Sequence, residues 1–119
     1  FARGAYILKK EKTAVFKTII ASGWEIHLAL QVAKNTNNIR VVSMPSIFDF
    51  NQQSKSYQKK IIPKKEKTLF LEISNDSGLY KWAQEIYGTR PWGYKDVRDG
   101  ISTNNSENIK KIKKLINKL

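Results

Sequence analysis

The chain has 119 residues, the length of one domain, and 40% of them are hydrophobic, enough for a packed core. It has no cysteine and a single histidine, which excludes a disulfide scaffold, a thiol nucleophile and a metal site built from several Cys or His ligands. The formal net charge of +12 is typical of proteins that bind nucleic acid or an anionic surface.

The first half of the chain has the pattern of a strand, a helix and a second strand. Thr13–Ala21 is β-branched and largely apolar, which predicts a buried strand. A helix follows through Lys34, with Ser22 as its cap and Glu25 at capping-box spacing. Ile39–Ser43 is a second apolar strand. Short links between the three predict a βαβ unit with parallel strands and a right-handed crossover.

The second half continues the alternation. We expect a short helix over Ser54–Ile61 and a strand over Thr68–Ile73. Ser77-Gly78 then precedes a helix through Tyr87, which the following glycine ends. Thr89–Tyr94 is a possible further strand, and Asn105–Leu119 is an amphipathic helix. The pattern predicts one α/β domain over residues 1–119, with three α/β/α layers and a mainly parallel, mixed sheet of about five strands.

The termini and the apolar runs bear on where the protein resides. No run approaches the roughly 18 apolar residues of a membrane helix, and no signal peptide is visible. We therefore expect a cytoplasmic domain with no membrane partner. The chain opens at Phe1 and its only methionine is Met44, so we expect a fragment of a longer product.

The composition of the basic excess argues against a nucleic-acid partner. It consists of 18 lysines and only 4 arginines, although arginine reads phosphates and bases better because its guanidinium bonds in bidentate fashion. The enriched residues Lys, Ile and Asn all have A/T-rich codons, which favours mutational bias. We expect no specific nucleic-acid partner, and a basic nucleic-acid-binding module remains the first alternative.

The turn at Ser22-Gly23 is the second alternative site. It lies where a strand enters a helix, so its free N–H groups could hold a small anion. There is no further glycine at dinucleotide spacing and no Gly-Lys-Ser/Thr sequence, which favours a structural turn. A small-anion-binding domain that uses this turn stays open.

Other polar residues carry weaker signals. His27 has no second His or Cys partner, so a surface or partly buried histidine is favoured over a catalytic one. The lysines around Pro63 fit a solvated connection, and Asp96–Gly100 fits a polar surface turn rather than a binding loop. We predict no catalytic, cofactor-binding or metal-binding residue in this chain.

Several segments resemble, in order, the C-terminal (third) domain of transketolases. Arg40–Ser46 matches that family's Arg-Val-Val-Ser-Met-Pro-Ser, and Ala2–Leu8 is similar to its Ala-Arg-Gly-Gly-Tyr-Val-Leu. Further similar positions are Ile20–Gly23, Glu25, Leu28, Ala29, Phe50, Gln53, Tyr57, Pro63, Leu71, Glu72, Tyr80, Tyr87 and Gly88. The chain departs from the family pattern at Trp24 and at Tyr94–Gly100.

The resemblance implies an activity for a longer enzyme. Transketolases use thiamine diphosphate and a divalent metal such as Mg²⁺ to move a two-carbon ketol unit from a ketose phosphate to an aldose phosphate, in the pentose phosphate pathway. The two preceding domains of a homodimer hold the cofactor, and their Gly-Asp-Gly motif does not occur in this chain. The resemblance therefore implies a non-catalytic, structural or regulatory domain that is inactive alone, with the preceding domains and the second subunit as its partners.

Overall fold

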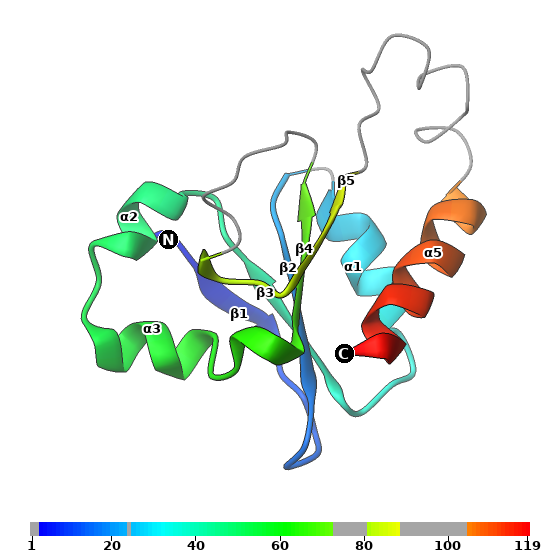
Figure 1. Cartoon of the computed structure of the whole chain (residues 1–119), viewed down its shortest axis with the longest axis horizontal. Helices are drawn as coiled ribbons and strands as arrows, with labels where there is room; N and C mark the ends of the chain where they lie inside the picture. The colour runs from blue at the N-terminus through cyan, green and yellow to red at the C-terminus, as the bar shows by residue number, and fades with distance from the viewer. Residues whose placement is uncertain (1–2, 24, 73–80, 89–104) are drawn as a thin grey trace, which may run out of the picture.

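The computed structural model describes residues 3–23, 25–72, 81–88 and 105–119, and its centre is a five-stranded mixed sheet (Figure 1). The strand order is β1-β3-β2-β4-β5. β1 pairs antiparallel with β3, whereas the other neighbours pair in parallel. The bounds are β1 Tyr6–Lys9, β2 Lys17–Ala21, β3 Ile39–Ser43, β4 Thr68–Glu72 and β5 Glu85–Gly88.

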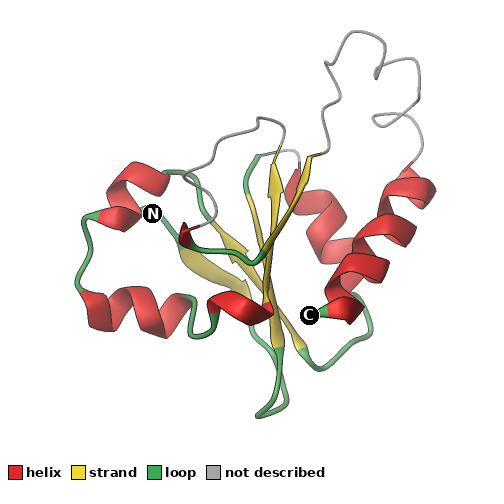
Figure 2. Ribbon diagram, in the orientation of Figure 1, coloured by secondary structure: helices red, strands yellow, loops and turns green. Residues whose placement is uncertain are grey.

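Helices cover both faces of this sheet, as Figure 2 shows. α1 (Glu25–Ala33) and α5 (Asn105–Lys118) lie on one face. α2 (Ile47–Asn51) and α3 (Lys55–Ile61) lie on the other, and a short 3₁₀ turn, η1 (Lys65–Lys67), leads into β4. The predicted three-layer α/β/α fold with a mainly parallel sheet is confirmed, and so is the parallel pairing of the two strands around α1.

Two apolar cores follow from the alternation of side chains along the strands. In β2, Ile19 and Ala21 face the core shared with α1 and α5, whereas Ile20 faces the core shared with α2 and α3. The α1/α5 core also contains Leu28, Val32, Val41, Leu69, Leu71, Ile112 and Ile116, and the α2/α3 core contains Val42, Met44, Phe50, Ile61, Phe70 and Trp82. A one-residue slip of β2 would move its side chains to the wrong cores.

The predicted strand over Thr13–Ala21 begins later, at Lys17. Its first partner residue in β3 is Ile39, so the residues before Lys17 have no ladder to join. They form a turn instead, in which the Thr13 hydroxyl donates to the carbonyl of Val15 at 2.8 Å. Val15 is 84% exposed, although the apolar run predicted a buried position.

The sequence pattern predicted neither a strand at β1 nor a helix at α2. β1 is a four-residue strand at the sheet edge, too short and too mixed to show a clear period. α2 has five residues, and the Ser46 hydroxyl caps it by accepting from the backbone N–H of Asp49 at 3.1 Å. The predicted helix over Ser54–Ile61 is confirmed as α3.

The helix predicted after Ser77-Gly78 is wrong at its C-terminal end, because Glu85–Gly88 forms the strand β5. Parallel pairing with β4, in which Ile86 lies beside Phe70, outweighs the helical spacing of the aromatic residues. Gly88 accordingly belongs to a strand rather than to a helix end. Residues 73–80 and 89–104 lie outside the described residues, and with them the start of this helix and the possible strand over Thr89–Tyr94.

The C-terminal helix has the predicted amphipathic arrangement. Ile112 and Ile116 are buried against the sheet, whereas its lysines are exposed. The Tyr87 hydroxyl of β5 donates to the side-chain oxygen of Asn108 at 2.8 Å, and Asn108 is only 2% exposed. Burial, with a smaller effect of the Glu107 carboxylate, raises the pKa of Tyr87, so this phenol stays a donor. The hydrogen bond ties α5 to the edge strand β5.

Substitution of Gly4 by Ala should destabilise the fold much more than the same change at Gly23. Both glycines have positive φ, +87° and +58°, which costs a side chain about 1–2 kcal/mol. A Cβ at Gly4 would also collide with the backbone of Ser46 and Phe50, whereas none of the described atoms lies within 4 Å of a Cβ at Gly23. The difference between the two variants in urea unfolding gives the cost of the steric collision at Gly4. Equal losses of stability would contradict this collision.

Replacing Tyr87 by Phe should lower the free energy of unfolding by about 1 kcal/mol. The loss should appear as faster amide hydrogen exchange in α5. Tyr57→Phe is the matched control, because the Tyr57 hydroxyl donates to the carbonyl of Ala5 on the opposite face at 2.8 Å. Faster exchange of α5 in both variants would contradict a local role for Tyr87.

Candidate functional site

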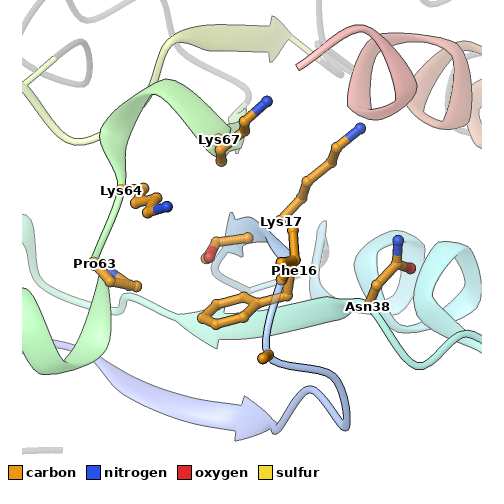
Figure 3. A pocket seen from close by; sticks show the side chains of 9 residues that line it. Phe16, Lys17, Asn38, Pro63, Lys64 and Lys67 are labelled. Atoms are coloured by element: carbon orange, nitrogen blue, oxygen red, sulfur yellow. The ribbon is translucent and has the colours of Figure 1, made fainter.

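A hollow of about 180 Å³ lies at the amino ends of the central strands (Figure 3). Its lining comes from the turn before β2, the residue before β3, and the connection from α3 to β4. The lining residues are Ala14, Val15, Phe16, Lys17, Thr18, Asn38, Pro63, Lys64 and Lys67. The charged residues among them are all lysines, and the wall formed by Phe16 and Pro63 is apolar.

Arg40 fixes the position of the Phe16 ring. The guanidinium carbon of Arg40 lies 4.6 Å from the ring centroid, which is the distance of a cation–π contact. The same guanidinium donates to both carboxylate oxygens of Glu11, at 2.7 and 2.9 Å. It also donates to the carbonyls of Lys60 and Ile61, at 2.8 and 3.0 Å. We call this arrangement the Arg40 clamp; it joins the β1–β2 connection, β3 and the end of α3.

Most of the clamp is shielded from water, since the side chains of Arg40 and Glu11 are 7% and 9% exposed. The hydrogen bond from Arg40, aided by the charges of Arg40 and Lys10, lowers the pKa of Glu11 against the opposing effect of burial. Glu11 is therefore ionised at neutral pH. A buried charge pair with this many hydrogen bonds specifies one geometry, because loss of either partner leaves the other charge uncompensated.

The lysines of the hollow differ in direction. Lys17 extends away from Phe16 toward α5, where its Nζ donates to the carbonyl of Asn117 at 3.4 Å, and Lys67 also extends away from the ring (Figure 3). Lys64 is exposed and lies next to Pro63 on the connection that leads to β4 (Figure 3). The carbonyl of Lys64 accepts from the Thr68 hydroxyl at 2.6 Å, which holds this connection against β4. The hollow thus offers apolar walls with ammonium groups around them.

The residues singled out from the sequence lie elsewhere. The Ser22-Gly23 turn joins β2 to α1 at the opposite end of the strands, and its carbonyls accept from the N–H groups of Glu25 and Ile26 at 3.2 and 3.3 Å. His27 is exposed on α1, as expected. Asp96–Gly100 lies outside the described residues. No sequence pattern links Glu11 to Arg40, because the two are 29 residues apart and meet only through the sheet.

The lining residues of the hollow include no paired acid and base. Within the described ranges, no three His, Asp or Glu side chains gather closely enough to hold a metal ion. None of the helices in the same ranges is long and apolar enough to cross a membrane.

Glu11→Gln should lower the free energy of unfolding at neutral pH by about 2 kcal/mol, because it removes the carboxylate partner of a buried guanidinium. Since folding lowers the pKa of Glu11, its stabilisation is full above the ordinary value of 4.5 and is lost as pH falls through the lower folded value. Urea midpoints measured between neutral pH and pH 3 should therefore converge for the two proteins in acid.

Glu66→Gln is the control, since Glu66 is exposed beside the same connection. It should leave the midpoint at neutral pH almost unchanged. A constant difference between wild type and Glu11→Gln down to pH 3 would contradict the role of the carboxylate charge.

Comparisons with known proteins identify the family. The model described as "Transketolase-like TK C-terminal domain" matches residues 4–104. Transketolase of Staphylococcus epidermidis is 33% identical over 85 residues, which are 67% of this chain and 13% of that protein. The crystal structure of transketolase from Campylobacter jejuni has a TM-score of 0.72 and 32% identity, covering 93% of this chain and 18% of that one. A transketolase mutant of Pichia stipitis in complex with xylulose-5-phosphate has a TM-score of 0.65 and 27% identity, covering 72% and 13%.

These matches agree with the resemblance in the sequence and give no support to a nucleic-acid-binding or anion-binding module as the alternative. The chain spans only 13% to 18% of the length of these relatives. The family match extends from before β1 to the residue preceding α5, so it includes all five strands. The chain therefore belongs to the transketolase-like C-terminal domain family.

Proposed function

We propose that this chain is the C-terminal domain of a transketolase that transfers a two-carbon ketol unit from a ketose phosphate to an aldose phosphate. The observation that carries the proposal is the family match over residues 4–104, together with the fold shared with the Campylobacter jejuni enzyme. The complex of the Pichia stipitis relative with xylulose-5-phosphate supports a ketose phosphate as the donor substrate.

The chemistry would lie outside this chain. The domain spans less than a fifth of its relatives, which leaves most of such an enzyme to hold thiamine diphosphate and a divalent metal. The hollow has apolar walls and lysines, and the clamp uses its carboxylate to hold a guanidinium. These groups serve packing and binding rather than proton transfer. We assign no catalytic, cofactor-binding or metal-binding residue to the chain.

The role of the domain in this proposal is mechanical. Residues 1–119 would form a single domain that packs against the preceding domains and supports a homodimer in the cytoplasm. The two cores on opposite sides of one sheet support this role, because they make a scaffold that does not require a bound cofactor for its packing.

The test compares three proteins: the full-length gene product, the same product without these residues, and the 119-residue chain alone. The full-length enzyme should transfer the ketol unit from xylulose-5-phosphate to an aldose phosphate only with thiamine diphosphate and Mg²⁺. The chain alone should give no turnover, and removal of the domain should weaken the dimer in sedimentation experiments. Turnover by the 119-residue chain would overturn the proposal, as would a full-length product without ketol transfer.

A further inference from the structure

We propose that the hollow at the amino ends of β2, β3 and β4 binds a small organic anion with an aromatic or branched apolar body. Nothing in the family match assigns a ligand to this position. The site lies at the opposite end of the strands from the Ser22-Gly23 turn, and the proposal does not depend on ketol transfer.

The size of the hollow sets the size of the ligand. At about 180 Å³ it is slightly larger than an engineered cavity of about 150 Å³ that binds benzene. One ring with a substituent, or a short branched chain, therefore fits. A sugar bisphosphate or a nucleotide is too large to be enclosed.

The apolar wall is already in its binding position. The Arg40 clamp fixes one contact of the Phe16 ring, and the clamp itself is held by two carboxylate oxygens and two backbone carbonyls. A ligand that packs on Phe16 would therefore order few side chains, which reduces the entropic cost of binding. Val15 at the rim is 84% exposed, and the body of a ligand would cover part of this apolar surface.

The charge around the hollow selects an anion. Lys17, Lys64 and Lys67 line it without an acidic neighbour in the lining, and Lys64 follows Pro63, which forms part of the apolar wall. Lys17 is directed to Asn117, so Lys64 is the lysine best placed to pair with a carboxylate or a phosphate monoester. A ring that reaches Phe16 would then carry its anionic group toward Lys64.

A second basic hollow provides an internal control. It has about 300 Å³, is more open, and is lined by Lys55, Gln58, Lys59, Ile62, Pro63, Lys65, Lys81 and Trp82. It has more lysines than the first hollow but lacks the wall made by Phe16. Binding driven by charge alone would favour this second hollow, whereas binding that also requires the enclosed apolar wall would favour the first.

The experiment is a titration of the ¹⁵N-labelled 119-residue chain, at constant ionic strength, with benzoate, phenyl phosphate, benzamide and inorganic phosphate. Benzoate and phenyl phosphate should give saturable amide shifts confined to residues 14–18, 38 and 64–68. Benzamide, which lacks the negative charge, should bind about fivefold more weakly than benzoate. Inorganic phosphate, which lacks the ring, should give shifts that do not saturate. The first two probes also distinguish a carboxylate from a phosphate ester as the preferred head.

Two pairs of variants locate the site. Lys64→Gln should weaken the binding of benzoate about fivefold and leave the binding of benzamide unchanged. Lys59→Gln makes the same change of charge in the second hollow and should not alter the binding of either compound. Val15→Asp should weaken benzoate more than Val15→Asn, and the exposure of Val15 makes both substitutions compatible with folding. Equal binding of benzoate and benzamide, shifts centred on Trp82, equal effects of the two lysine variants, or no saturable shift would overturn the proposal.

Discussion

Strand β2 is the element on which the rest of the fold depends, because it pairs on both edges and is buried on both faces. β3 and β4 occupy its edges, and Ile19 and Ile20 point into different cores. The period of two along a strand makes this arrangement strict: one register places all of its apolar side chains correctly, and a slip of one residue places none. The helices on either side are positioned by this alternation, since each must cover the side chains that β2 and its neighbours present.

The segments beyond the amino ends of the parallel strands are held by side-chain interactions, because the strand ladder does not continue there. There the Arg40 clamp replaces backbone pairing with a buried ion pair, two bonds to carbonyls and a ring contact. It joins segments that are far apart in the chain, and it leaves the Phe16 ring as the wall of a hollow surrounded by lysines. The same interaction therefore stabilises the fold and prepares a surface that can receive a ligand.

Family and function rest on different kinds of observation in this protein. The family follows from a match along most of the chain and from a shared strand arrangement. The function stays a proposal, because the chain spans less than a fifth of the length of these relatives. Among the described residues, the printed ion pair joins Arg40 to Glu11 inside the clamp. The net charge of +12 is carried mainly by exposed lysines, which suit solubility and weak anion binding better than specific recognition.

The sequence by itself determined the parallel pair around α1, the helix α3, the amphipathic α5 and the family resemblance. These depend on local periodicity, on turn residues and on short motifs such as Arg40–Ser46, all of which are readable along the chain. Only the tertiary structure decided that Glu85–Gly88 is a strand, since its pairing with β4 overrides local spacing. The same holds for the clamp between Glu11 and Arg40 and for the hollow beside Phe16. Their partners meet only after the sheet has formed, and a contact between distant residues leaves no periodic signal in a single sequence.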